Sequence, residues 1–277
     1  LVRSQSAVQD ISWMRAMIQA LVRPAVRGVD INALDVVARW SSDRNLFEQV
    51  HGVDPDMLSD AELLSLRPAV FRRIAAAPAP PRIYMKAHDA NLRVGDGRLF
   101  PDDLPILTLH LVRHPYDVAV SLSHHGQIDL DAAIAFMADD EAREGGHQPA
   151  HVRRGFRNHS QLPQHVGSWS GHTLSFLDRP ARRSLLVRYE DLLTDPASEL
   201  ARVTRFLGLE SSPSDIERAI ETTRFDRLAG QEEKAGFVER PVGMTRFFRA
   251  GRSGSGAELS DRQKAAIDQR HQAAMQR

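Results

Sequence analysis

The stretch Pro-Ile-Leu-Thr-Leu-His-Leu-Val-Arg at 105–113 constrains the fold more than any other part of this sequence. Its apolar and β-branched side chains occupy both faces, which is typical of a strand in a parallel sheet whose two faces are both buried. Pro115 follows at once, and proline is favoured at the first position of a helix because its missing N–H costs nothing there. The sequence therefore predicts a central strand at 107–112 that leads into a helix over 115–125.

Two other apolar runs predict strands at 83–87 and 184–188. Strands that alternate with helices indicate an α/β fold. We expect three layers, with a central, mainly parallel sheet flanked by helices, in a single domain over 1–277. Helices are expected at 12–23, 43–51, 59–67, 68–76, 130–142, 164–177, 196–207, 213–222 and from Ser260, with a loop-like stretch over 230–256.

Residues 126–165 form a long polar connection rich in His, Arg and Gly. Polar connections above a rigid sheet are where binding specificity usually lies. We expect this segment to form a lid or a wall of the substrate site.

Composition excludes several classes of function. The 36 basic residues balance the 36 acidic ones, so a general nucleic-acid binder is not expected and any anion site must be local. The absence of cysteine excludes disulfides, thiolate metal sites and cysteine nucleophiles. No apolar run is long enough to span a bilayer, and the start of the sequence has no apolar signal region. We therefore expect a cytoplasmic protein.

Candidate chemistry lies at the strand ends. Arg113 closes the central strand just before a helix, where an arginine and free helix N–H groups can bind an anion. The alternative is structural: Arg113 caps the helix and pairs with Asp117. Tyr189 closes the strand at 184–188, and good helix capping by Asp195 is the structural alternative there.

Lys86 and His88 follow the strand pattern near 83–88. Residues two apart on a strand point to the same side, so both can face one pocket. The alternative is a solvated lysine and a core histidine.

Together these segments resemble the PAPS-dependent sulfotransferases, over about 83–256. The family's 3′-phosphate motif is matched by Arg113, Pro115, Asp117 and Ser121 at the same spacing. Its Tyr-Glu-Asp-Leu-x-x-Asp-Pro element is matched at 189–196, its Lys-x-His motif at 86–88, its Thr-Ser-Phe motif by 223–225, and its Arg-Lys-Gly loop by 249–251.

The resemblance implies a sulfotransferase-like P-loop-type fold. It implies metal-independent transfer of a sulfuryl group from 3′-phosphoadenosine 5′-phosphosulfate (PAPS), with 3′,5′-bisphosphoadenosine (PAP) as product. The acceptor is expected to be a hydroxyl or amine of a small molecule, such as a glycosylated or phenolic natural product. The implied catalytic residues are His88 as base and Lys86. The implied nucleotide-binding residues are Arg113, Ser121, Tyr189, Thr223, Phe225, Arg249 and Gly251.

The sequence departs from the family at residues 6–12, where a phosphate-binding loop with Lys and Gly is expected. Val8 stands where the lysine should be and Asp10 where the glycine should be. Arg224 and Ala250 are smaller departures. Three explanations remain open: a catalytically degenerate protein that binds nucleotide or a partner, a donor site built from other groups such as Lys86 and Arg3, or an N-terminus that is not the whole natural region.

Other enzyme classes fit less well. The Walker motif and the metal-binding pattern His-Glu-x-x-His are absent from the sequence. The Gly-rich run at 251–256 does not lie between a strand and a helix of a βαβ unit, so it does not indicate a dinucleotide fold.

Overall fold

Short parallel strands build the central sheet. The computed structural model describes residues 2–4, 8–23, 28–37, 39–76, 78, 82–144, 161–177 and 183–277. Within them the strands of the sheet are β1 (Val2–Ser4), β2 (Arg39–Trp40), β3 (Met85–Ala87), β6 (Thr108–Val112) and β9 (Ser184–Arg188). Their order is β2-β3-β1-β6-β9, and every neighbouring pair is parallel. The three strands predicted from the sequence are confirmed.

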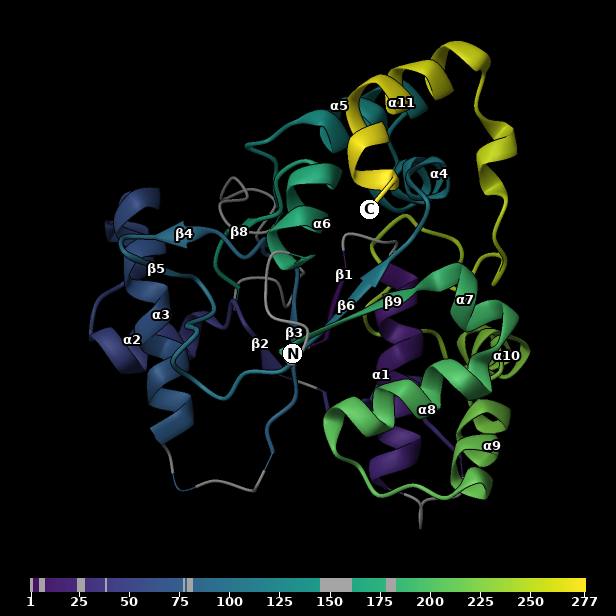
Figure 1. The fold of residues 1–277 in the computed structure, drawn as a ribbon, viewed down its shortest axis with the longest axis horizontal. Helices are drawn as coiled ribbons and strands as arrows, with labels where there is room; N and C mark the ends of the chain where they lie inside the picture. Colours follow the sequence, from purple (N-terminus) through teal and green to yellow (C-terminus); the bar gives the residue numbers. More distant parts are fainter. Residues whose placement is uncertain are drawn as a thin grey trace.

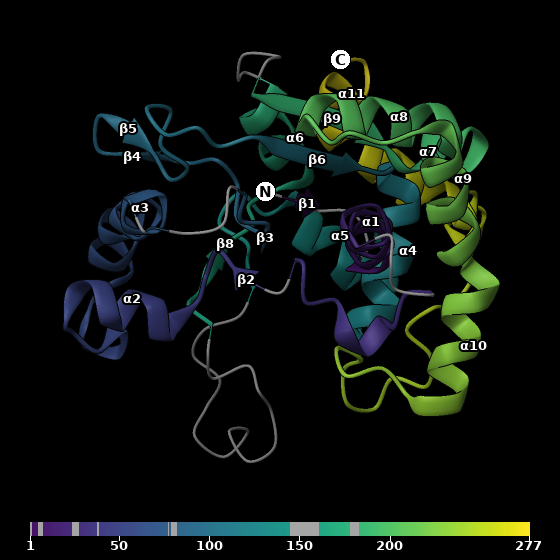
Figure 2. The same ribbon diagram turned by 90° about the horizontal axis from the view of Figure 1, so that it is seen from below.

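Helices cover both faces of the sheet (Figures 1 and 2). Figure 2 shows α6 and α8 on one side of β6 and β9, with α1 and α4 on the other. The predicted α/β fold with three layers is confirmed, although the sheet is small. The helices are α1 (Val8–Val22), α2 (Arg44–His51), α3 (Asp60–Ala76), α4 (Pro115–Gly126), α5 (Leu130–Ala138), α6 (Trp169–Leu177), α7 (Tyr189–Thr194), α8 (Pro196–Leu207), α9 (Pro213–Thr222), α10 (Phe225–Ala235) and α11 (Asp261–Met275).

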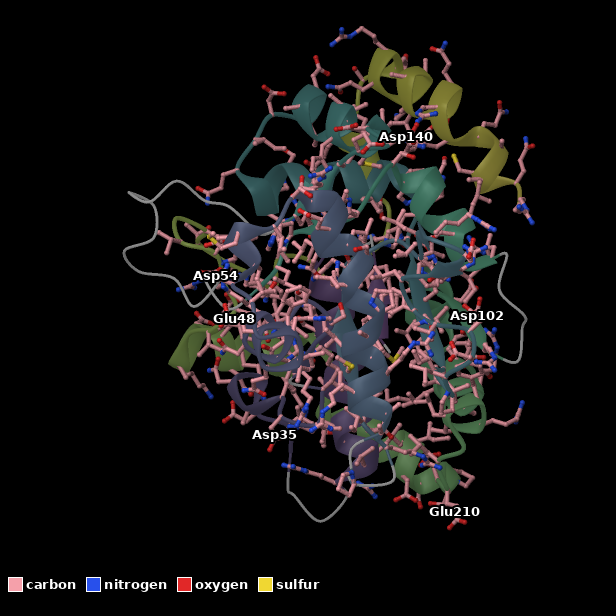
Figure 3. All side chains as sticks on the ribbon, turned by 90° about the vertical axis from the view of Figure 1, so that its left-hand side faces the viewer. Asp35, Glu48, Asp54, Asp102, Asp140 and Glu210 are labelled. Atoms are coloured by element: carbon pink, nitrogen blue, oxygen red, sulfur yellow. The ribbon has the colours of Figure 1, made fainter. Side chains whose placement is uncertain are left out.

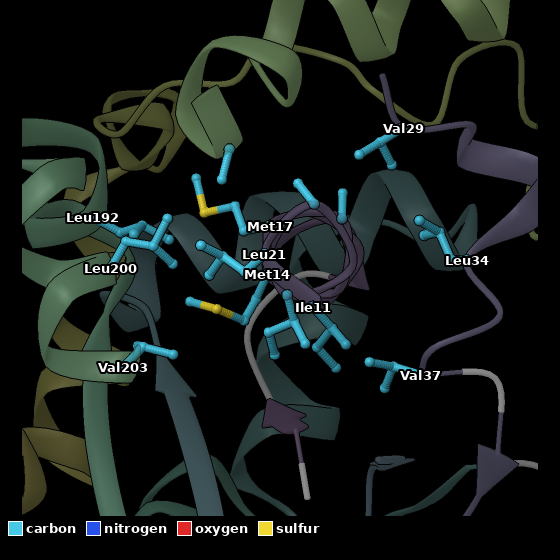
Figure 4. Packing of buried hydrophobic residues seen from close by; sticks show 14 of the residues in the cluster. Ile11, Met14, Met17, Leu21, Val29, Leu34, Val37, Leu192, Leu200 and Val203 are labelled. Atoms are coloured by element: carbon cyan, nitrogen blue, oxygen red, sulfur yellow. The ribbon is translucent and has the colours of Figure 1, made fainter. Parts of the chain in front are cut away.

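Helix α1 is the centre of the largest hydrophobic cluster, in which Figure 4 shows it end-on. Its buried side chains include Ile11, Met14, Met17 and Leu21. They pack against apolar residues of β6, β9, α8 and α9 and of the segment 29–37. This packing fixes the direction of α1 relative to the ends of β1 and β6.

Several helices begin at capping residues, at the positions predicted from the sequence. Asp43 and Asp195 accept backbone N–H groups at the starts of α2 and α8, and Ser260 forms a capping box at the start of α11. These caps satisfy helix N–H groups that otherwise lack partners.

Helix α3 corrects the prediction of two helices at 59–67 and 68–76. It is continuous, with Pro68 inside it. An interior proline removes one backbone hydrogen bond and strains the helix. Leu63 before Pro68 and Val70 and Phe71 after it are nevertheless buried, and their packing keeps the helix continuous through the proline.

Helix α10 corrects the prediction that 230–256 is loop-like throughout, because residues 230–235 are helical. Glu232 is buried there, and its carboxylate accepts the backbone N–H groups of Phe247 and Phe248, both at 2.8 Å. A tertiary contact therefore stabilises a helix that the local sequence does not indicate. The helix predicted at 164–177 begins only at Trp169, because Gln164–His165 forms β8, paired with β7 (Arg143–Glu144).

The surface carries charges of both signs. Figure 3 shows Asp35, Glu48 and Asp140 among the side chains on one side of the molecule. Each is paired with an arginine, at 2.6, 2.9 and 2.6 Å respectively. Across the described ranges, no helix combines the length and apolarity that crossing a membrane requires.

Candidate active site

The candidate site lies where the chain direction across the sheet reverses. From β1 the chain continues to β2 and β3 on one side, and from β3 it crosses to β6 and β9 on the other. In open parallel sheets, ligands bind at the carboxyl ends of the strands at such a point. Lys86 lies in β3, Arg113 follows β6 and Tyr189 follows β9. Three of the predicted residues therefore lie at or near the carboxyl ends of these strands.

Arg113 lies buried among acidic and aromatic groups. Its guanidinium lies 4.3 Å from the centre of the Tyr189 ring, 3.1 Å from Asp117 and 3.6 Å from Asp10. It also donates a hydrogen bond to the carbonyl of Arg252 at 2.8 Å. Burial opposes the charge, but the nearby Asp10 and Asp117 raise the pKa of Arg113, so it remains a cation.

Asp117 ties the start of α4 to the Gly-rich segment near the C-terminus. One carboxylate oxygen accepts the N–H of Gly256 at 2.7 Å, and the other accepts the N–H of Gly254 at 2.9 Å. A Cβ at Gly256 would lie 2.5 Å from the Cβ of Tyr116, so only glycine fits there. The structural alternative for Arg113, pairing with Asp117, is therefore present, and the pair also positions this loop.

Arg249 contacts the helix that carries Ser121. Arg249 contacts His124 at 2.9 Å, Ser255 at 3.4 Å and Glu258 at 3.6 Å. Ser121 is buried one turn before His124 on α4. Residues three apart on a helix lie on one face, so Ser121 shares a face of α4 with His124, the residue that Arg249 contacts.

A small aromatic pocket of about 40 Å³ lies beside Arg113. The rings of Trp13 and Tyr189 meet edge to face at 6.0 Å on its wall. Gly251 has φ +57°, and a Cβ there would lie 2.3 Å from the Phe225 ring. The pocket thus gathers three predicted residues; its lining is Asp10, Trp13, Tyr189, Leu193, Phe225, Leu228, Phe248 and Gly251.

Thr223 is fully buried next to this pocket rather than in its lining. Its hydroxyl donates to the carbonyl of Ala219 at 2.7 Å, at the end of α9. Its own carbonyl accepts the indole N–H of Trp13 at 2.9 Å. Thr223 therefore supports the pocket through its backbone.

Lys86 is buried beside an acidic residue that sequence reasoning missed. Its Nζ lies 3.4 Å from Glu239 and 4.3 Å from the centre of the Trp40 ring. Glu239 also accepts two hydrogen bonds from Arg15, at 2.7 and 2.9 Å. Burial lowers the pKa of Lys86 to about 8, against the opposing effect of Glu239.

His88 lies next to Lys86 on the same side of the sheet edge. Its Nδ1 is 3.7 Å from a carboxylate oxygen of Glu144, and its ring lies 5.8 Å from Trp40. Its backbone N–H is accepted by Gln164 at 3.1 Å. Glu144 was missed as a site residue, because the sequence shows it only within the long polar connection.

The residue after His88, Asp89, belongs to a buried ion pair. Arg67 and Asp89 form two hydrogen bonds of 2.6 Å, and both side chains are almost fully buried. Asp89 also accepts the N–H of His165 at 3.0 Å. This pair joins α3, the residue after His88 and β8, and nothing in the local sequence indicates it.

The segment with the unusual sequence at 6–12 is helical where it is described. Residues 5–7 lie outside the described residues, and α1 begins at Val8. Asp10 is buried and faces Arg113. The predicted lid at 126–165 includes α5, β7 and β8, but its residues 145–160 lie outside the described residues, and its role stays a prediction. In the described part of the chain no group of three or more acidic or histidine residues is placed to hold a metal ion.

Comparison with known proteins identifies the family. The model of the sulfotransferase domain matches residues 102–277. Mouse sulfotransferase SULT7A1 complexed with PAP superimposes with a TM-score of 0.60 at 16% identity, covering 100% of this chain and 84% of that one. Retinol dehydratase in a complex with retinol and PAP gives a TM-score of 0.59 at 17% identity, covering 99% and 80%.

A search of curated protein sequences gives no match to the chain. The family model covers more than half of it, however, and the structural likeness extends over its whole length. The chain belongs to the sulfotransferase domain family.

Proposed function

We propose that this chain binds PAPS and transfers its sulfuryl group to a hydroxyl or amine of a small-molecule acceptor. The observation that carries the proposal is the convergence, at one sheet edge, of two neighbouring clusters. Arg113, Tyr189 and Phe225 form an aromatic and cationic cluster, and Lys86 and His88 form a second cluster with acid–base groups. A donor nucleotide and an acceptor need such adjacent sites.

The first cluster suits a phosphorylated nucleotide. The small aromatic pocket presents the rings of Trp13, Tyr189 and Phe225, which are of the kind that stack against a purine. Arg113, Ser121 and Arg249 are proposed to hold the 3′-phosphate, because guanidinium groups bind phosphate with two parallel hydrogen bonds. The PAP held by the mouse sulfotransferase and by retinol dehydratase supports a nucleotide of this kind as the ligand.

The second cluster suits transfer between oxygens. His88 accepts the proton of the acceptor hydroxyl as its oxygen bonds to sulfur, and the electron pair of the breaking S–O bond leaves with the donor phosphate. Lys86, with a pKa of about 8, remains largely protonated near pH 7 and stabilises the negative charge on the transferring group.

A second candidate function is nucleotide or partner binding without chemistry. The buried carboxylate of Asp10 favours this candidate, because it lies 3.6 Å from the Arg113 guanidinium that is proposed to bind phosphate. The start of α1 at Val8 also favours it, because the family has a glycine-containing loop in this region. A negative charge there opposes an anionic ligand.

Transfer of radiolabelled sulfuryl from PAPS to a panel of phenols, sugars, alcohols and amines tests the proposal. A companion experiment repeats the assay with the fourfold variant Ala7→Pro, Val8→Lys, Gln9→Ser and Asp10→Gly, which restores the family's loop residues. Transfer by the natural sequence supports the enzyme, whereas transfer only after the fourfold change supports the second candidate. Absence of both transfer and PAP binding contradicts the enzyme and the nucleotide-binding form of the second candidate.

A further inference from the structure

We propose that Glu144 is a positioning residue for His88, holding its imidazole so that Nε2 faces the acceptor. The inference rests on the proposed role of His88 as base. It extends the site to a strand pair, β7 and β8, outside the segments matched by the family motifs.

The backbone fixes where Glu144 lies. In the β7–β8 ladder Glu144 is paired with Gln164, whose side chain accepts the N–H of His88 at 3.1 Å. The next residue of β8, His165, accepts the N–H of Ala90 at 2.7 Å. Two hydrogen bonds from one strand therefore hold residues 88–90, and the partner strand carries Glu144 to 3.7 Å from Nδ1 of His88.

The chemistry follows from which ring nitrogen faces the carboxylate. A carboxylate near Nδ1 favours the tautomer with the proton on Nδ1, in which Nε2 carries the lone pair that can accept a proton. It also stabilises the imidazolium formed during transfer, as the acid does in acid–base dyads of hydrolases. During sulfuryl transfer the proton from the acceptor stays on Nε2 of His88. Glu144 therefore need not take up a proton.

Other charged groups act on the same pair. Desolvation and Asp89 raise the pKa of Glu144, whereas the ammonium of Lys86 lowers it. The Glu144 side chain is 36% exposed, so water still solvates the carboxylate that faces His88. Burial lowers the pKa values of His125 and His165, which lie on α4 and β8. The charged and titratable groups beside His88 and Glu144 are Lys86, Asp89 with its partner Arg67, His165 and His172. Glu239 and His125 act on Lys86.

The test follows the titration of His88 by NMR in the full chain without any ligand. Its ring signal is identified by its absence from the spectrum of His88→Gln. In Glu144→Gln, loss of the negative charge should lower the titration midpoint of His88 by about one pH unit, since opposite charges at this range shift pKa values by ~1–3 units. Glu144→Asp should restore part of the shift. Glu141→Gln, an exposed glutamate on the same segment, is the matched control and should change nothing.

Activity supplies a second readout. The acidic limb of the kcat/KM profile should move to lower pH in Glu144→Gln by the same amount, with PAP affinity unchanged. An unchanged His88 midpoint in folded Glu144→Gln overturns the inference whether or not the chain transfers sulfuryl groups. A shifted midpoint in a chain without transfer activity supports the Glu144–His88 contact and contradicts the proposed function instead.

Discussion

Lys86 and Glu239 are 153 positions apart in the sequence, and their charged groups lie 3.4 Å apart beside the candidate reaction centre. Glu239 is held from the other side by Arg15. Burial opposes ionisation of Glu239, but Lys86 and Arg15 together lower its pKa, so the carboxylate is charged. An anionic group that reaches Lys86 must therefore share this lysine with Glu239.

Lys86 predicts a stability change at alkaline pH. Its pKa is about 8 in the folded protein against 10.5 normally, so between these values only the unfolded chain binds the proton. The free energy of unfolding should rise with pH across that window, by on the order of 3 kcal/mol. Urea unfolding at pH 7–10.5 measures this. Lys86→Met should abolish the rise, and Lys234→Met, at an exposed lysine, should preserve it.

Arg113 should control nucleotide affinity. Arg113→Ala removes charge-assisted hydrogen bonds worth about 1.5–3 kcal/mol, so the Kd for PAP measured by calorimetry should rise at least tenfold. Arg188→Ala is the control, because Arg188 is exposed at the end of β9. Equal PAP affinity in Arg113→Ala and wild type would show that the nucleotide binds elsewhere.

Asp10 should weaken nucleotide binding through its charge. Asp10→Asn keeps the size of the side chain and removes the carboxylate 3.6 Å from Arg113. PAP should then bind more tightly, by roughly tenfold for one opposing buried charge. Weaker binding in Asp10→Asn would instead indicate that Asp10 is needed to orient Arg113.

The Arg67–Asp89 pair should contribute strongly to stability. Removing one partner of a buried ion pair leaves an uncompensated charge and typically costs about 3–5 kcal/mol, so Asp89→Asn should unfold at much lower urea concentration. The exposed pair Arg72–Asp103 is the matched control, and Asp103→Asn should leave the urea midpoint almost unchanged. Similar losses in both variants would contradict this view of the pair.

The parts of the molecule predicted from sequence depend on local patterns. The strand at 107–112 and the helix at Pro115 follow from hydrophobic runs and proline chemistry within ten residues. Arg113, Tyr189 and Gly251 lie in motifs of fixed spacing, and the structure places all three at or beside the aromatic pocket.

The parts that were missed depend on contacts between distant segments. Glu239 meets Lys86 and Arg15 only after the chain has folded, and Glu144 reaches His88 through the β7–β8 ladder. Neither glutamate is distinguished by its neighbours in the sequence. Helix α10 was also missed, since the buried contacts of Glu232 stabilise it.

The central claim is that His88 acts on the acceptor while Arg113 and its neighbours hold the nucleotide. The most direct test measures sulfuryl transfer from PAPS and PAP binding on the same preparations of wild type and His88→Ala. The account predicts transfer that falls by ~10²–10⁴-fold in His88→Ala, with the Kd for PAP unchanged. Equal turnover in wild type and His88→Ala, or no PAP binding by either at millimolar concentration, would contradict it.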